Sequence, residues 1–165
     1  MIDLSKEITV VNNFLTDDDI DYMCNFIRGR QWTIQTSDPD NPKALEFLQL
    51  PVGLKEQYFL DLYSRIQDEM KTSQKISDIY FNGQWPGRHG EFHEDNGSTT
   101  VLLYISSYHP SWGGFTQFAN SNEDQVIVAP LYKRMVYFNS KILHKAYAFA
   151  YQHCPLRVSL AYKLI

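Results

Sequence analysis

Three side chains with metal-binding chemistry occur in two strand-like parts of the sequence. His93 and Asp95 lie in FHEDNGSTTVLLYIS, directly before an apolar run that is typical of a strand. Alternate side chains of extended chain face the same way, so we expect His93 and Asp95 to share one face while Glu94 points to the other. His144 begins a later strand-like segment, HKAYAFA. Since strands far apart in sequence become neighbours in an antiparallel barrel, His144 can complete the set.

Two imidazoles and one carboxylate on one face of a metal are suited to Fe(II) and to oxygen chemistry. The three positions left open admit a chelating cosubstrate together with dioxygen. Arg157 follows on the last strand-like segment, LRVSLAYKL, between apolar neighbours. A buried arginine is costly unless it meets a carboxylate, which its planar fork matches with two hydrogen bonds. A ligand can bring that carboxylate.

The elements that position these residues follow from the apolar pattern. Residues 7–14 read as a strand, Thr16 is placed to cap a helix with three acids in its first turn, and residues 54–73 have the period of an amphipathic helix. The stretch 35–43, with two prolines, is predicted to be a loop. Seven short strand-like segments then follow: KISDIYF, TTVLLYIS, FTQFA, DQVIVA, RMVYFN, HKAYAFA and LRVSLAYKL.

This order of elements predicts a mostly β protein, a barrel or sandwich with N-terminal helices packed on one face. We expect a single domain over residues 1–165, with helical support at roughly 16–73 and the barrel at roughly 75–165. The composition agrees with one globular core, since 44% of the residues are hydrophobic and 15% are aromatic.

Charge and targeting signals narrow the class of protein. The formal net charge is -4 and the basic residues are scattered, so no nucleic-acid partner is expected. The sequence shows neither a secretory signal nor a membrane span, which predicts a cytoplasmic protein without a membrane partner. Cys24 and Cys154 lack the spacing of a zinc site and are interpreted as packed thiols. The sequence predicts no particular oligomeric state.

Several motifs together resemble the 2-oxoglutarate- and Fe(II)-dependent oxygenase superfamily, and within it the prolyl 4-hydroxylase-like branch. The order His-Glu-Asp, His144 and Arg157 matches that family's metal and cosubstrate motifs. YFNGQ resembles the branch's Tyr-x-x-Gly-Gln, TVLLYIS resembles the strand after the metal motif, and WGGFTQF resembles its Gly-Gly-x-Thr-x-Phe turn. The matches cover roughly residues 76–165.

The resemblance implies a role for each matched residue. His93, Asp95 and His144 would be the catalytic centre and would hold Fe(II). Arg157 would bind the distal carboxylate of 2-oxoglutarate, Tyr104 would aim at the same carboxylate, and Tyr80 would line the cosubstrate pocket. For both tyrosines the alternative is an ordinary core position with a satisfied hydroxyl. The implied fold is a double-stranded β-helix of the jelly-roll or cupin type.

The implied activity is hydroxylation of an unactivated C–H bond with dioxygen, coupled to decarboxylation of 2-oxoglutarate to succinate. Ascorbate is a further cofactor of the kind that the branch uses. A proline-containing peptide or protein is the favoured substrate, and another amino acid, a nucleobase or a small metabolite is the alternative. Two other classes stay open: a non-catalytic barrel that binds metal or ligand, and a zinc-dependent hydrolase.

The remaining histidines and two tryptophans have plainer interpretations. His89 precedes His93 by four residues, but two nearby glycines argue against the helix that a zinc pair needs. His109 and His153 are predicted to be surface imidazoles in loops. Trp85 and Trp112 flank the predicted site in sequence, and either substrate contact or core packing fits them.

Overall fold

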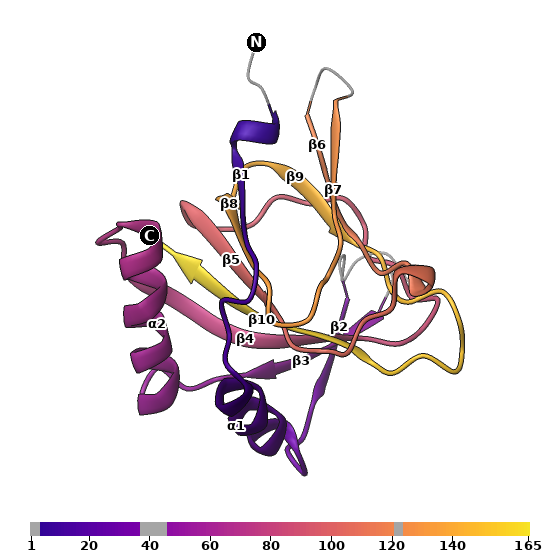
Figure 1. Ribbon diagram of the computed structural model, residues 1–165, viewed down its shortest axis with the longest axis horizontal. Helices are drawn as coiled ribbons and strands as arrows, with labels where there is room; N and C mark the ends of the chain where they lie inside the picture. Colours follow the sequence, from indigo (N-terminus) through magenta and orange to yellow (C-terminus); the bar gives the residue numbers. More distant parts are fainter. Residues whose placement is uncertain (1–3, 37–45, 121–123) are drawn as a thin grey trace.

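The computed structural model describes residues 4–36, 46–120 and 124–165. These residues form ten strands, two α-helices and two short 3-10 helices (Figure 1). The bounds are η1 Leu4–Lys6, β1 Ile8–Val11, α1 Asp17–Ile27, β2 Thr33–Thr36, β3 Glu46–Pro51, α2 Gln57–Met70, β4 Ile76–Gln84, β5 Thr99–Tyr104, η2 Pro110–Trp112, β6 Thr116–Ala119, β7 Gln125–Val128, β8 Met135–Asn139, β9 Leu143–Ala146 and β10 Arg157–Leu164.

The strands form two antiparallel sheets. The larger sheet has the order β1-β8-β5-β10-β4-β3-β2, and the smaller sheet has the order β7-β6-β9. Strands that follow one another in the sequence are often not paired in a sheet. For example, β10, at the C-terminal end of the chain, lies between β5 and β4. A buried apolar cluster joins the sheets, and in it the rings of Phe118 on β6 and Phe138 on β8 lie 4.7 Å apart. The molecule is therefore a mostly β sandwich, as the sequence predicted.

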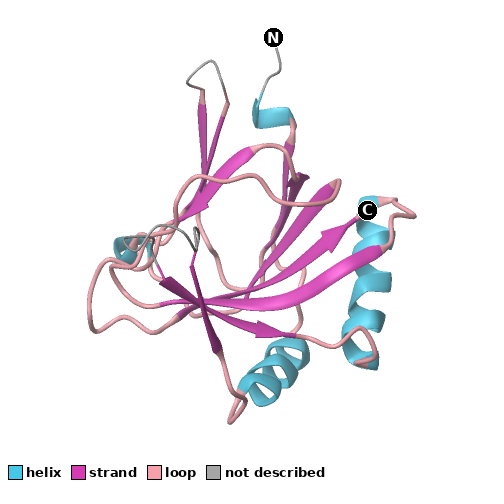
Figure 2. Cartoon of the chain, turned by 180° about the vertical axis from the view of Figure 1, so that it is seen from behind, coloured by secondary structure: helices cyan, strands magenta, loops and turns pink. Residues whose placement is uncertain are grey.

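Strand β10 shows how the larger sheet separates two environments. Its even-numbered residues, Val158, Leu160, Tyr162 and Leu164, join the apolar core that contains buried residues of both helices. The Tyr162 hydroxyl also donates a hydrogen bond to the Phe59 carbonyl of α2 at 2.9 Å. Since strand side chains alternate, the odd-numbered residues of β10 face the other way, toward the smaller sheet. Figure 2 shows both helices lying outside the sheets.

The first helix begins where the sequence predicted. The Thr16 hydroxyl accepts a hydrogen bond from the Asp19 amide at 3.1 Å, and the Asp19 carboxylate accepts one from the Thr16 amide at 2.7 Å. This capping box satisfies two amides that a helix start leaves without partners. Thr16 therefore fixes the start of α1, and Ile20 and Met23 are buried beneath it.

Other boundaries differ from the predictions. The second helix is shorter than 54–73, and Leu54 lies before it with 51% of its surface exposed. Strands β2 and β3 were not predicted, because β2 has no buried residue and so no apolar alternation. The predicted loop at 35–43 is wrong at Gln35 and Thr36, which end β2, and its remainder lies outside the described residues.

Within the described ranges, no helix has both the length and the apolar character that crossing a membrane requires.

Candidate metal centre

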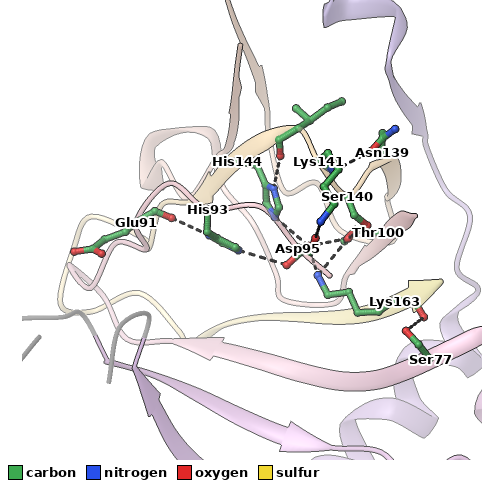
Figure 3. A network of polar contacts seen from close by, with 11 residues as sticks. Ser77, Glu91, His93, Asp95, Thr100, Asn139, Ser140, Lys141, His144 and Lys163 are labelled. Carbon is green, nitrogen blue, oxygen red and sulfur yellow. Dashed lines mark hydrogen bonds and ion pairs between the residues drawn. The ribbon is translucent and has the colours of Figure 1, made fainter. Parts of the chain in front are cut away.

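His93, Asp95 and His144 converge on one point, although they come from separate parts of the chain (Figure 3). One potential ligand atom from each lies within 4.8 Å of the others. Asp95 Oδ1 is 3.6 Å from His93 Nε2, and Asp95 Oδ2 is 3.2 Å from His144 Nε2. His144 belongs to β9, while the other two lie in the segment that leads into β5. The sequence predicted this convergence.

The backbone, rather than strand alternation, sets the positions of His93 and Asp95. His93 forms an isolated bridge with His144, and each of the two amides donates to the other residue's carbonyl at 3.0 Å. Asp95 lies outside any strand, and its amide donates to the Ser140 carbonyl at 2.9 Å. The expectation that both side chains share the face of one strand is therefore wrong, although the result is the same.

Both histidines turn the same ring nitrogen toward Asp95. Nδ1 of His144 lies 2.8 Å from the Ile142 carbonyl, and Nδ1 of His93 lies 2.9 Å from the Glu91 carbonyl. A carbonyl can only accept, so each Nδ1 carries the proton and a neutral ring keeps its lone pair on Nε2. His144 Nε2 then faces a carboxylate oxygen at 3.2 Å, two acceptors in contact. A cation between them removes this repulsion, so the residues fit a metal ion.

The protonation states also suit metal binding. Burial would raise the pKa of Asp95, but the Lys163 ammonium in contact with the carboxylate holds that pKa well below its usual value. Partial burial lowers the pKa of His93. An ionised carboxylate and a neutral imidazole are the forms that coordinate metals.

A cavity of about 340 Å³ adjoins this cluster and extends along the inner face of the larger sheet. This volume is at the lower end of the range for small-molecule sites. The residues that line it include all three candidate ligands and, on the sheet, Tyr80, Asn82, Gln84, Ser159, Arg157 and Lys163. A small polar molecule would fit between the metal cluster and the arginine.

Arg157 is buried, with only 3% of its surface exposed. Its Nε donates to the Gly114 carbonyl at 2.9 Å, and its two terminal nitrogens donate to Gln84 Oε1 and Thr116 Oγ1, each at 3.1 Å. All three acceptors are neutral, and no carboxylate of a described residue pairs with this guanidinium. Among the described residues, two of its five N–H groups have no acceptor, so the site presents a buried cation without an anion from that part of the chain.

The two predicted tyrosines occupy different positions. Tyr80 lines the cavity, and burial raises the pKa of its hydroxyl, with Asp95 adding to the effect. Tyr104 is fully buried and does not line the cavity. Its hydroxyl lies 2.7 Å from Thr116 Oγ1, and its ring centre is 5.5 Å from the Arg157 guanidinium. Tyr104 therefore contacts the lining of the cavity through its hydroxyl at Thr116 and through its ring face at Arg157.

Sequence reasoning missed Lys163, Thr100 and Thr116. Lys163 faces the same way as Arg157 on β10, and the alternation that singled out Arg157 would have found it. Thr100 donates to Asp95 Oδ2 at 2.7 Å. Thr116 is the threonine of the matched Gly-Gly-x-Thr-x-Phe turn, but no role was predicted for it. The contacts of both threonines depend on pairing between distant strands, which local sequence does not signal.

The other histidines are not part of the metal cluster. His89 borders the cavity, and its Nδ1 accepts from the Ala148 amide at 3.2 Å. His109 is exposed and caps η2, and His153 is exposed and stacks on Tyr151. Trp112 packs edge-on against Phe149, with ring centres 5.5 Å apart. Cys24 and Cys154 are free thiols.

No protein-family model matches the sequence, and no curated protein matches it either. Solved structures do. A prolyl-4-hydroxylase from Pseudomonas putida matches with a TM-score of 0.74 at 17% identity, over 99% of this chain and 96% of that one. An oxidoreductase of the 2OG-Fe(II) oxygenase family from Burkholderia pseudomallei matches with a TM-score of 0.75 at 12% identity, over 96% and 85%.

A third similar structure is a prolyl hydroxylase from Trichoplax adhaerens in complex with a peptide fragment of the hypoxia inducible factor oxygen degradation domain. It matches with a TM-score of 0.75 at 16% identity, over 98% of this chain and 84% of that one. The chain thus has the fold of the 2-oxoglutarate- and Fe(II)-dependent oxygenases, prolyl hydroxylases among them. This agrees with the mostly β fold that the sequence predicted.

Proposed function

We propose that the protein is a 2-oxoglutarate- and Fe(II)-dependent dioxygenase that hydroxylates an unactivated C–H bond. One observation carries the proposal: a cluster of two imidazoles and one carboxylate shares a cavity with a buried arginine that pairs with no carboxylate in the described part of the chain. A cluster of metal-binding side chains and a buried arginine that can bind an anion are each common in proteins. Their presence in one cavity of about 340 Å³, on this fold, supports the oxygenase.

His93 and His144 would bind Fe(II) through Nε2, and Asp95 would bind it through a carboxylate oxygen. Three protein ligands leave positions for a chelating cosubstrate and for dioxygen. Iron bound there would supply the oxygen chemistry, and the protein's part is to orient the reactants and exclude water. Dioxygen would be the oxidant in this reaction, and ascorbate is a further predicted cofactor.

Arg157 would bind the distal carboxylate of 2-oxoglutarate with its two remaining N–H groups. Gln84, Gly114 and Thr116 fix the plane of the guanidinium, so that these two groups are held in place before the ligand arrives. Tyr104 would act through Thr116, and Tyr80 would form part of the wall. With this assignment, we propose that the chain is a single domain whose two sheets form a double-stranded β-helix.

Peptidyl proline is the substrate that we favour, because two of the similar structures are prolyl hydroxylases and one of them holds a peptide. A non-proline residue, a nucleobase or a small metabolite is the alternative within the same reaction class. A barrel that binds metal without turnover is the alternative outside it.

The test is incubation of the protein in air with Fe(II), 2-oxoglutarate and a panel of proline-rich peptides. We expect succinate to form and a peptide to gain one oxygen atom, measured by mass spectrometry. Succinate formation without a modified peptide would support the oxygenase activity but would exclude these peptides as substrates. Fe(II) binding without succinate formation under any condition would favour the non-catalytic barrel.

A further inference from the structure

A buried lysine touches the candidate metal centre, and the roles described above do not use it. Lys163 is on β10, with 8% of its surface exposed. Its ammonium contacts Asp95 Oδ2 and lies 3.2 Å from Thr100 Oγ1, which it can reach with a second hydrogen bond (Figure 3). A buried ammonium is costly, so its position needs a reason.

The two oxygens of Asp95 have different surroundings. Oδ2 receives the hydroxyl of Thr100 at 2.7 Å as well as the Lys163 ammonium. Oδ2 also lies 3.2 Å from His144 Nε2, whereas Oδ1 faces His93 Nε2 at 3.6 Å, which is beyond hydrogen-bond length. Each carboxylate oxygen therefore faces one histidine, and among the described residues Thr100 and Lys163 donate to Oδ2 alone.

We propose that Lys163 is a positioning residue for the metal ligand Asp95. Together with Thr100 it holds Oδ2, so that Oδ1 is presented to the metal and the carboxylate binds through one oxygen. This inference rests on the proposed metal site and concerns how that site is held. The effect is that of an outer partner which orients a ligand, a role that is commonly worth a factor of about 10 to 100 in metal affinity.

A chain of contacts fixes this arrangement from several strands. The Thr100 hydroxyl of β5 lies 3.1 Å from the Ser140 hydroxyl, and the Ser140 carbonyl accepts the Asp95 amide at 2.9 Å. Asp95 is thus tied at its backbone and at one carboxylate oxygen. Lys163 pairs with Thr100 across β10 and β5, so the donors to Oδ2 come from adjacent strands.

The competing interpretation is that Lys163 is only a counter-ion for Asp95 in the absence of metal. A counter-ion repels a divalent cation, so its removal should tighten metal binding. An orienting donor has the opposite effect, since its removal lets the carboxylate rotate. Substitution of Thr100 helps to distinguish the orienting role from the counter-ion role, because Thr100 donates to the same oxygen but carries no charge.

The experiment measures Mn(II) affinity of the metal-free protein by calorimetry, for wild type, K163M and T100V. The control K75M removes an exposed charge just before β4, the strand that pairs with β10. Melting temperatures establish that each variant folds. We expect K163M to weaken Mn(II) binding about 10-fold or more, T100V to weaken it in the same direction, and K75M to leave it unchanged.

Unchanged or tighter Mn(II) binding by folded K163M would overturn the role of Lys163 and leave the metal site intact. If K163M does not fold, T100V decides, and unchanged affinity there would overturn the proposal. Absence of Mn(II) binding by the wild-type protein would overturn both this inference and the proposed metal site.

Discussion

His93 and His144 exchange two backbone hydrogen bonds, each with an N···O distance of 3.0 Å, and their ring centres lie 4.4 Å apart. This single bridge ties the segment before β5 to strand β9. It positions two candidate ligands by main-chain contacts, which no side-chain rotation can undo. The candidate metal centre is therefore part of the pairing between distant segments, and a preorganised site of this kind would bind metal without a large ordering cost.

Replacement of Asp95 by asparagine tests the carboxylate ligand. D95N keeps the size of the side chain and loses its charge, so we expect metal affinity to fall at least as far as for an outer partner, about 10- to 100-fold. Succinate formation should fall with it. Calorimetry with Mn(II) and a succinate assay measure both effects, and D68N, an exposed change on α2, is the control. Wild-type affinity in D95N would exclude Asp95 as a ligand.

Arg157 should control the affinity for 2-oxoglutarate. Hydrogen bonds from a charged group contribute about 1.5–3 kcal/mol, so R157M is expected to raise the KM for 2-oxoglutarate about 10- to 100-fold. R157K should recover only part of this loss, because lysine cannot reproduce the planar fork. The exposed R28M is the matched control. The assignment fails if R157M changes kcat alone and leaves KM as it was.

Tyr104 is predicted to act through Thr116. Y104F removes the hydroxyl that lies 2.7 Å from Thr116 Oγ1 and leaves the ring in place. We expect a loss of about 1 kcal/mol in the free energy of unfolding and a rise of a few-fold in the KM for 2-oxoglutarate. Denaturant unfolding and a succinate assay measure the two quantities. A loss of stability with no change in KM would make Tyr104 a core residue only.

Acid should weaken the fold through Asp19. Burial by itself raises the pKa of this carboxyl, but hydrogen bonds from Arg65 and Tyr58 outweigh it and lower the pKa to about 2. A lowered pKa stabilises the ionised folded state, fully so above the unfolded value of about 4. This contribution, about 2 kcal/mol, is lost as the pH falls toward about 2.

The measurement is urea unfolding of wild type, D19N and the exposed control D18N at several pH values. D19N should be about 2 kcal/mol less stable at pH 7 and should show a flatter dependence of stability on pH between 4 and 2. An unaltered slope in D19N would assign the acid sensitivity to other groups.

The sequence predicted which residues come together better than it predicted the local structure around them. His93, Asp95, His144 and Arg157 were found from residue types and order, and the structure brings all four to one cavity. The geometry of Asp95 could not be found in this way, because a hydrogen bond to the Ser140 carbonyl, rather than a strand, directs it.

Edge strands and cross-strand contacts were the parts that the sequence did not reveal. β2 has no buried side chain, so the apolar alternation on which strand prediction depends is absent there. Lys163 and Thr100 meet only because β10 lies beside β5, a pairing set by the whole sheet. Long-range pairing is a property of the folded chain that local patterns do not encode.

The most direct test of the metal and cosubstrate site is a crystal structure of the protein with Mn(II) and 2-oxoglutarate, with the metal located by its anomalous scattering. We predict one metal peak about 2.0–2.3 Å from His93 Nε2, His144 Nε2 and one oxygen of Asp95, with the distal carboxylate of 2-oxoglutarate on Arg157. A metal bound elsewhere, or 2-oxoglutarate bound away from Arg157, would contradict the proposed site.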